Sequence, residues 1–122
     1  MATIKSFTSI EQSRKLAEIL PLESADMYYE WPNKKVHFKD DKYNGMGASC
    51  WSLAALRNLL PPAIKPNKDS YLFLFESHNT FDKSWVYRYY NEDDTSCLYY
   101  KNTNEVDACV EMIIRLHELN LL

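Results

Sequence analysis

Apolar side chains recur at helical spacing in three segments of the chain. The spacing predicts helices over residues 9–20, over Cys50 to Leu60, and from residue 103 or 104 to about residue 119. Ser49 is expected to cap the middle helix, and Pro61-Pro62 to end it. Because Cys50 to Leu60 carries almost no charge, we expect it to be the most buried helix.

Polar and apolar residues alternate in much of the remaining chain, which is typical of strands with one buried face. The alternation predicts strands over Asp26 to Trp31 and Lys35 to Lys39, joined by a turn at Pro32-Asn33. A three-stranded meander is expected over residues 71–76, 84–90 and 96–101. The expected order α-β-β-α-β-β-β-α makes one α+β domain over residues 1–122, with a mostly antiparallel sheet and the helices packed on one face.

The composition is that of a globular protein, and it narrows the classes of partner. Of the 122 residues, 46% are apolar and 25% are charged. The formal net charge of -3 disfavours a nucleic-acid partner, because Lys and Arg side chains supply most of the affinity for phosphates. Charged residues interrupt the first twenty positions, so we expect no signal peptide and no membrane partner.

Cysteine, histidine and glycine spacing favours neither a disulfide framework nor a cofactor. Cys50, Cys97 and Cys109 are odd in number and lack the spacing of a zinc knuckle, which suits a reducing cytoplasm. His37 beside Asp40-Asp41 does not define a tetrahedral set of ligands, so we expect no metal. The chain has no glycine-rich nucleotide-binding loop, and we expect no cofactor.

The segment Gly47-Ala48-Ser49-Cys50-Trp51-Ser52 is the sharpest candidate for chemistry. It is predicted to place Cys50 in the first turn of a helix, where the helix dipole stabilises a thiolate. The segment is similar to the cysteine signature of papain-like proteases, and His78 and Asn79 follow in a compatible order. The glutamine that such an oxyanion hole requires is missing, since the nearest upstream one is Gln12. A cysteine hydrolase is therefore one alternative, and a buried structural thiol is the other.

Large aromatic side chains are unusually frequent in the predicted strands. Alternation sends half of a strand's rings to the face opposite the helices, where one helical layer cannot cover them. We expect part of this set to form an exposed surface that binds a protein partner or a second copy of the chain. The residues concerned are Tyr28, Trp31, Trp85, Tyr87, Tyr89, Tyr99 and Tyr100.

Four segments together resemble a group of small hypothetical proteins found in gut bacterial and phage or mobile-element genomes. They are Ser9 to Leu16, Ser24 to Tyr28, Cys50 to Leu56 and Val106 to Met112. The resemblance spans most of the chain and implies a mobile-element context, but no activity or catalytic site.

Three functional hypotheses follow from these observations. The leading hypothesis is a non-enzymatic interaction module, such as a phage or mobile-element accessory protein, that binds through an aromatic sheet face. The first alternative is a small hydrolase that uses Cys50 and His78. The second is a protein that binds a small ligand between sheet and helices.

Overall fold

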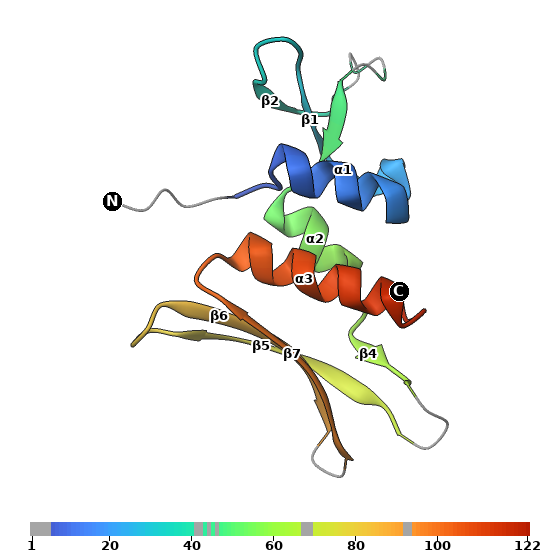
Figure 1. Ribbon diagram of the computed structural model, residues 1–122, viewed down its shortest axis with the longest axis vertical. Helices are drawn as coiled ribbons and strands as arrows, with labels where there is room; N and C mark the ends of the chain where they lie inside the picture. The colour runs from blue at the N-terminus through green and yellow to red at the C-terminus, as the bar shows by residue number, and fades with distance from the viewer. Residues whose placement is uncertain (1–5, 41–42, 44, 46, 67–69, 92–93) are drawn as a thin grey trace.

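The computed structural model describes residues 6–40, 43, 45, 47–66, 70–91 and 94–122, with the backbone alone for residues 94–97. These residues form three α-helices, one short 3-10 helix and two antiparallel sheets, which confirms the α+β class and most of the expected order (Figure 1). The elements are α1 (Ile10–Ile19), η1 (Leu22–Ser24), β1 (Met27–Tyr29), β2 (Val36–Phe38), β3 (Ala48–Cys50), α2 (Leu53–Leu59), β4 (Ala63–Ile64), β5 (Leu72–Asn79), β6 (Ser84–Asn91), β7 (Asp94–Asn102) and α3 (Glu105–Glu118).

The helices lie between the two sheets, where a single sheet was expected (Figure 1). The smaller sheet has the order β2-β1-β3, and α1 packs against β3. The larger sheet has the order β4-β5-β6-β7, and α3 packs across β6 and β7. Helices therefore cover one face of the larger sheet, as expected, and the same helical layer also supports the smaller sheet.

Local capping signals fix where the first and last helices begin. Ser9 caps α1 in a capping box, because its side chain accepts from the Gln12 backbone N–H while the Gln12 side chain accepts from the Ser9 N–H. The Asn104 side chain accepts from the backbone N–H of Asp107 at the start of α3. Both helices therefore begin where the sequence predicts them.

The prediction of a helix from Cys50 is wrong in its first turn. Residues 48–50 form β3, which pairs with β1 so that Cys50 lies opposite Met27. The helix begins at Leu53, because Ser52, not Ser49, caps it by accepting from the Ala55 N–H. Cys50, an apolar residue that looked like part of a helix start, is instead the buried last residue of a paired strand.

The most buried helix is α3, not α2. Seven residues of α3 are buried: Val106, Ala108, Cys109, Val110, Met112, Ile113 and Leu116. In α2 only Leu56 is buried, while Ala54, Arg57 and Asn58 are exposed. The difference arises because α3 packs on the larger sheet with one face and contacts α1 and α2 with others, whereas α2 covers less of the sheet.

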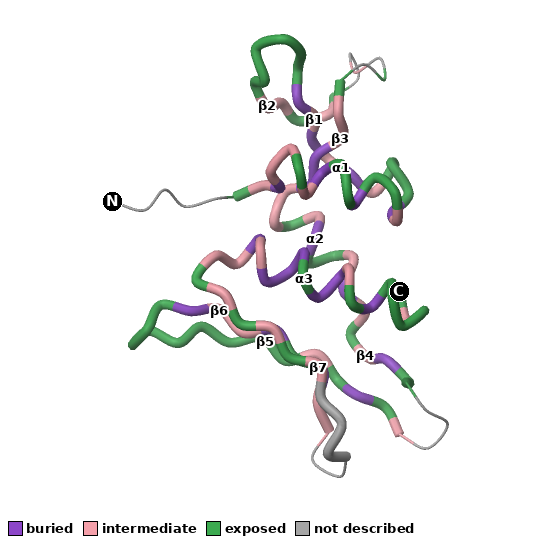
Figure 2. Tube along the Cα trace, in the orientation of Figure 1, coloured by how far each residue is buried: buried purple, intermediate pink, exposed green. Residues whose placement is uncertain are grey.

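The meander β5-β6-β7 confirms the predicted strands and makes most of the larger sheet. The pattern missed β4, a two-residue strand that follows Pro61-Pro62 and pairs with the start of β5. Leu72, Tyr87 and Tyr89 are buried in one core cluster with residues of the helices. Much of β5 is exposed (Figure 2). No helix in the described part of the chain is both long and apolar enough to cross a bilayer.

Candidate functional site

Four of the seven aromatic residues expected at a contact surface face the helices instead. Tyr87 and Tyr89 are 0% exposed, so the prediction that they contact a partner is wrong. Trp85 lies on the same face of β6 by strand alternation, and Tyr100 of β7 lies opposite Tyr87. Both Trp85 and Tyr100 are partly buried. The hydroxyl of Tyr89 donates to the Pro61 carbonyl at 2.7 Å, and burial raises the pKa of its phenol. Tyr87, Tyr89 and Tyr100 therefore belong to or pack against the core, whereas Trp85 stacks on His78.

The other three expected residues lie in two separate places. Tyr28 belongs to β1, where its ring packs against His37 and Tyr43, and it is partly buried. Trp31 follows the same strand and is 43% exposed. Tyr99, on β7, is 51% exposed on the side of the larger sheet that faces away from the helices. The structure therefore does not gather the seven residues into one surface.

A different set of residues forms an aromatic surface on that side of the larger sheet. We call it the outer aromatic face, and it consists of Phe73, Phe75, Arg88, Tyr90 and Tyr99. Phe75 lies opposite Arg88, which in turn lies opposite Tyr99, so these side chains make one row across three strands. Phe73 lies opposite Tyr90 in the next row. Phe73 and Phe75 are 49% and 48% exposed, in contrast to the buried face beneath them.

Arg88 is held in this surface by rings. Its guanidinium carbon lies 4.9 Å from the ring centre of Tyr90 and 5.8 Å from that of Phe75. The rings of Phe75 and Tyr90 meet edge to face, with centres 6.0 Å apart. The three side chains therefore form one ordered cluster of two rings and a cation.

A signal for this face is present in the sequence of β6. Tyr87 and Tyr89 alternate with Arg88, and an arginine is seldom fully buried without a partner. The position of Arg88 thus indicates that the tyrosines beside it point inward. Its strand partners, Phe75 and Tyr99, then point outward with it.

The structure does not assemble the cysteine hydrolase site. Cys50 lies in β3 of the smaller sheet, is 0% exposed, and its thiol donates to the Thr8 carbonyl at 3.5 Å. His78 lies in β5 of the larger sheet and stacks on Trp85, with ring centres 4.2 Å apart. The Asn79 side chain accepts a hydrogen bond from the backbone N–H of Phe81 in the β5–β6 turn. Burial raises the pKa of the Cys50 thiol, which disfavours the thiolate that attack requires.

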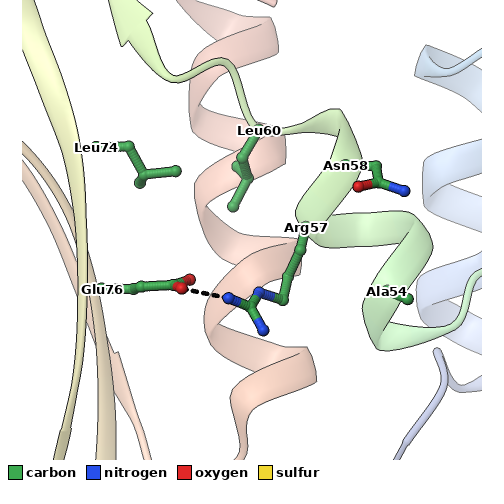
Figure 3. Close-up of a pocket in the computed structure, with 6 residues that line it drawn as sticks. All are labelled: Ala54, Arg57, Asn58, Leu60, Leu74 and Glu76. Carbon is green, nitrogen blue, oxygen red and sulfur yellow. Dashed lines mark hydrogen bonds and ion pairs between the residues drawn. The ribbon is translucent and has the colours of Figure 1, made fainter.

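A cavity of about 440 Å³ opens between α2 and β5 (Figure 3). The Arg57 side chain from α2 reaches Glu76 of β5 and forms an ion pair with it at the cavity wall. The residues that line the cavity are Ala54, Arg57, Asn58, Leu60, Leu74 and Glu76. This cavity could admit a small ligand, although its two charged groups already satisfy each other.

A histidine outside this cavity also has a local partner. His37 forms a 2.6 Å contact with Glu30 at the surface of the smaller sheet. Across the residues that the structure describes, no group of three or more His, Cys, Asp and Glu side chains could hold a metal ion.

Comparison with known proteins gives no relative. No family model matches the chain, and no match is found among curated proteins or solved structures. The candidate site is therefore identified from the structure of this chain alone.

Proposed function

We propose that the chain is a non-enzymatic interaction module that binds a protein partner through the outer aromatic face. The observation that carries this proposal is that Phe73, Phe75 and Tyr99 are each about half exposed, at 49%, 48% and 51%, on one sheet face. Folding alone gives no reason to place three large rings in water. Burying them against a partner would recover the apolar area that the helices leave uncovered.

The ring and cation chemistry of the face also supports this function. Aromatic residues and Arg are enriched at protein interfaces, where they supply much of the binding energy. Tyr90 and Phe75 restrain Arg88, so less side-chain entropy is lost when a partner covers it. The rings also stand on a three-stranded meander, which presents them as a fixed surface.

A second candidate function is binding of a small ligand in the cavity between α2 and β5. Its volume of about 440 Å³ lies within the range of ligand sites. We rank this candidate below protein binding because the Arg57–Glu76 ion pair must be opened or solvated by the ligand.

The cytoplasm is the compartment that we propose for this interaction. Cys50 and Cys109 are free thiols among the described residues, which suits a reducing environment. A role as a phage or mobile-element accessory protein stays a proposal that rests on the sequence resemblance.

Photo-crosslinking in the organism that encodes the chain tests the proposed function. A photoreactive phenylalanine analogue replaces Phe75 in one sample and Tyr99 in another, and it replaces Phe38 in the control. Phe38 is a suitable control because it is 66% exposed on the smaller sheet, away from the outer aromatic face. We expect positions 75 and 99 to capture the same protein and position 38 not to capture it. If neither position 75 nor position 99 captures more protein than the control position 38, the proposal is contradicted.

A further inference from the structure

Among the described side chains, the charges on the side of the larger sheet that carries the outer aromatic face are of one sign. The outward positions of β5, β6 and β7 between residues 73 and 101 with described side chains include Arg88 and Lys101 and no carboxylate. Lys101 already forms a 2.8 Å ion pair with Asp82 in the β5–β6 turn. The whole chain has a net charge of -3, so this face differs in sign from the rest of the molecule.

Arg88 differs from the other arginines with described contacts. Arg57 pairs with Glu76 and Arg115 pairs with Glu118. Arg88 has ring contacts and no carboxylate partner in the described part of the chain. Among the contacts of the described residues, none uses the N–H donors of this guanidinium, which lies between Phe75 and Tyr99 in the cross-strand row.

We infer that the partner of this face is a protein segment that places a carboxylate against Arg88, between apolar or aromatic side chains. This inference rests on the proposed function and names the chemistry of its partner. An exposed ion pair contributes little in water, but one enclosed by Phe75, Tyr90 and Tyr99 would lose its water on binding. Arg also offers the paired donors that a carboxylate accepts.

Two other occupants fit the face less well. A second copy of the chain, related by a two-fold axis, would set Arg88 against the same cationic face, because such an interface brings identical patches together. A single-stranded nucleic acid could stack its bases on the rings, but its backbone needs several cations. The face offers Arg88 and a lysine that Asp82 already neutralises.

Binding of defined peptides tests the inference. The probes are a short capped peptide of alternating phenylalanine and glutamate, the same peptide with lysine for glutamate, and the same peptide with serine for phenylalanine. An oligothymidylate of similar length is the nucleic-acid probe. Binding is followed by NMR shifts of the labelled full chain, which also locate the contact.

We expect the phenylalanine–glutamate peptide to bind at Arg88 and Tyr99 more tightly than the other three probes. Arg88→Gln should weaken it about tenfold or more, and Arg88→Glu should reverse the preference toward the lysine peptide. Arg115→Gln is the matched control, because it removes an arginine on α3 that pairs with Glu118, and it should leave binding unchanged. Unchanged NMR spectra away from the substituted residue check that each variant is folded.

Four results would overturn the inference: no binding by the glutamate peptide, equal or tighter binding by the lysine peptide, no effect of Arg88→Gln, or tighter binding of oligothymidylate through Arg88. The photo-crosslinking separates this failure from failure of the proposed function. If positions 75 and 99 still capture a protein and Arg88→Gln leaves the yield unchanged, the face is an interface but its partner is not acidic. If neither position captures a protein, the proposed function itself fails.

Discussion

Two tyrosines on the larger sheet should differ greatly in their contribution to stability. Tyr89 is 0% exposed and donates to the Pro61 carbonyl, whereas Tyr99 is 51% exposed on the outer aromatic face. Replacing a buried aromatic residue with alanine costs about 3–5 kcal/mol, which we expect for Tyr89→Ala. A half-exposed ring contributes roughly half the transfer free energy of a buried one, so Tyr99→Ala should cost about 1 kcal/mol, including its strand propensity.

Urea unfolding followed by circular dichroism measures this difference, with the free energies extrapolated to water. Because Tyr89→Ala could prevent folding, Tyr89→Phe is a milder variant that removes the hydroxyl alone. It leaves the Pro61 carbonyl without its 2.7 Å donor and should cost about 1 kcal/mol. Equal losses for Tyr89→Ala and Tyr99→Ala would show that both sheet faces are covered in solution. That result would refute the distinction between an inner core and an outer contact face.

The remaining predictions concern thiols, alkaline stability and two local contacts. Iodoacetamide should label Cys50 and Cys109 slowly in the folded chain and rapidly in denaturant, because both are buried and burial raises both pKa values; rapid labelling of Cys50 in the folded chain would contradict its burial. Burial raises the pKa of Cys109 from 9.0 to about 12 and that of Tyr29 from 10.0 to about 12, so their neutral forms are favoured by folding. The contribution of these two neutral side chains to folding stability is complete below about pH 9 and is lost toward pH 12. Thermal melts across this range should therefore show falling stability, and a stability that does not change with pH would contradict this prediction. The hydrogen bond from Lys101 lowers the pKa of Asp82 to about 2, so Lys101→Met should raise the carboxyl NMR midpoint of Asp82, and an unmoved midpoint would argue against the ion pair. Ser52→Ala should lower the free energy of unfolding by about 1 kcal/mol because it removes the cap of α2, whereas Ser49→Ala removes no helix cap. A larger loss for Ser49→Ala than for Ser52→Ala would instead support a helix that starts at Cys50.

The helices α1 and α3 could be predicted because their signals are local. Ser9 with Gln12, and Asn104 at the start of the apolar stripe of α3, satisfy backbone groups within one helical turn. The meander β5-β6-β7 was also predictable, because consecutive strands pair across short turns. These elements are confirmed close to their expected bounds.

The short strands could not be predicted from the local pattern of polar and apolar residues. β3 has three residues, and its partner β1 lies about twenty residues earlier, so its pairing depends on tertiary contacts. The apolar residues Cys50 and Trp51 precede a true helix, which made them resemble its first turn. Trp51 instead fills the core, with its indole N–H donating to Ser24 at 2.9 Å.

The aromatic surface was predictable in principle but not in its residues. Alternation correctly implies that one sheet face lacks a helical cover. It does not say which set of alternate residues faces outward when both sets contain rings, as in Trp85 to Tyr90. The charge on Arg88 indicates which residues of β6 face outward. Because Phe75 and Tyr99 lie opposite Arg88 in the neighbouring strands, they face outward too.

Oxidative footprinting of the aromatic rings tests most directly whether the outer aromatic face is an interface. Hydroxyl radicals modify exposed rings, and mass spectrometry compares the purified chain with the same chain inside cells. We predict that Phe73, Phe75 and Tyr99 are modified in the purified chain and protected in cells, because a partner covers them there. Phe38 and Phe81, which are 66% and 99% exposed outside this face, should be modified equally in both samples. Equal modification of all five rings in both samples would contradict the account.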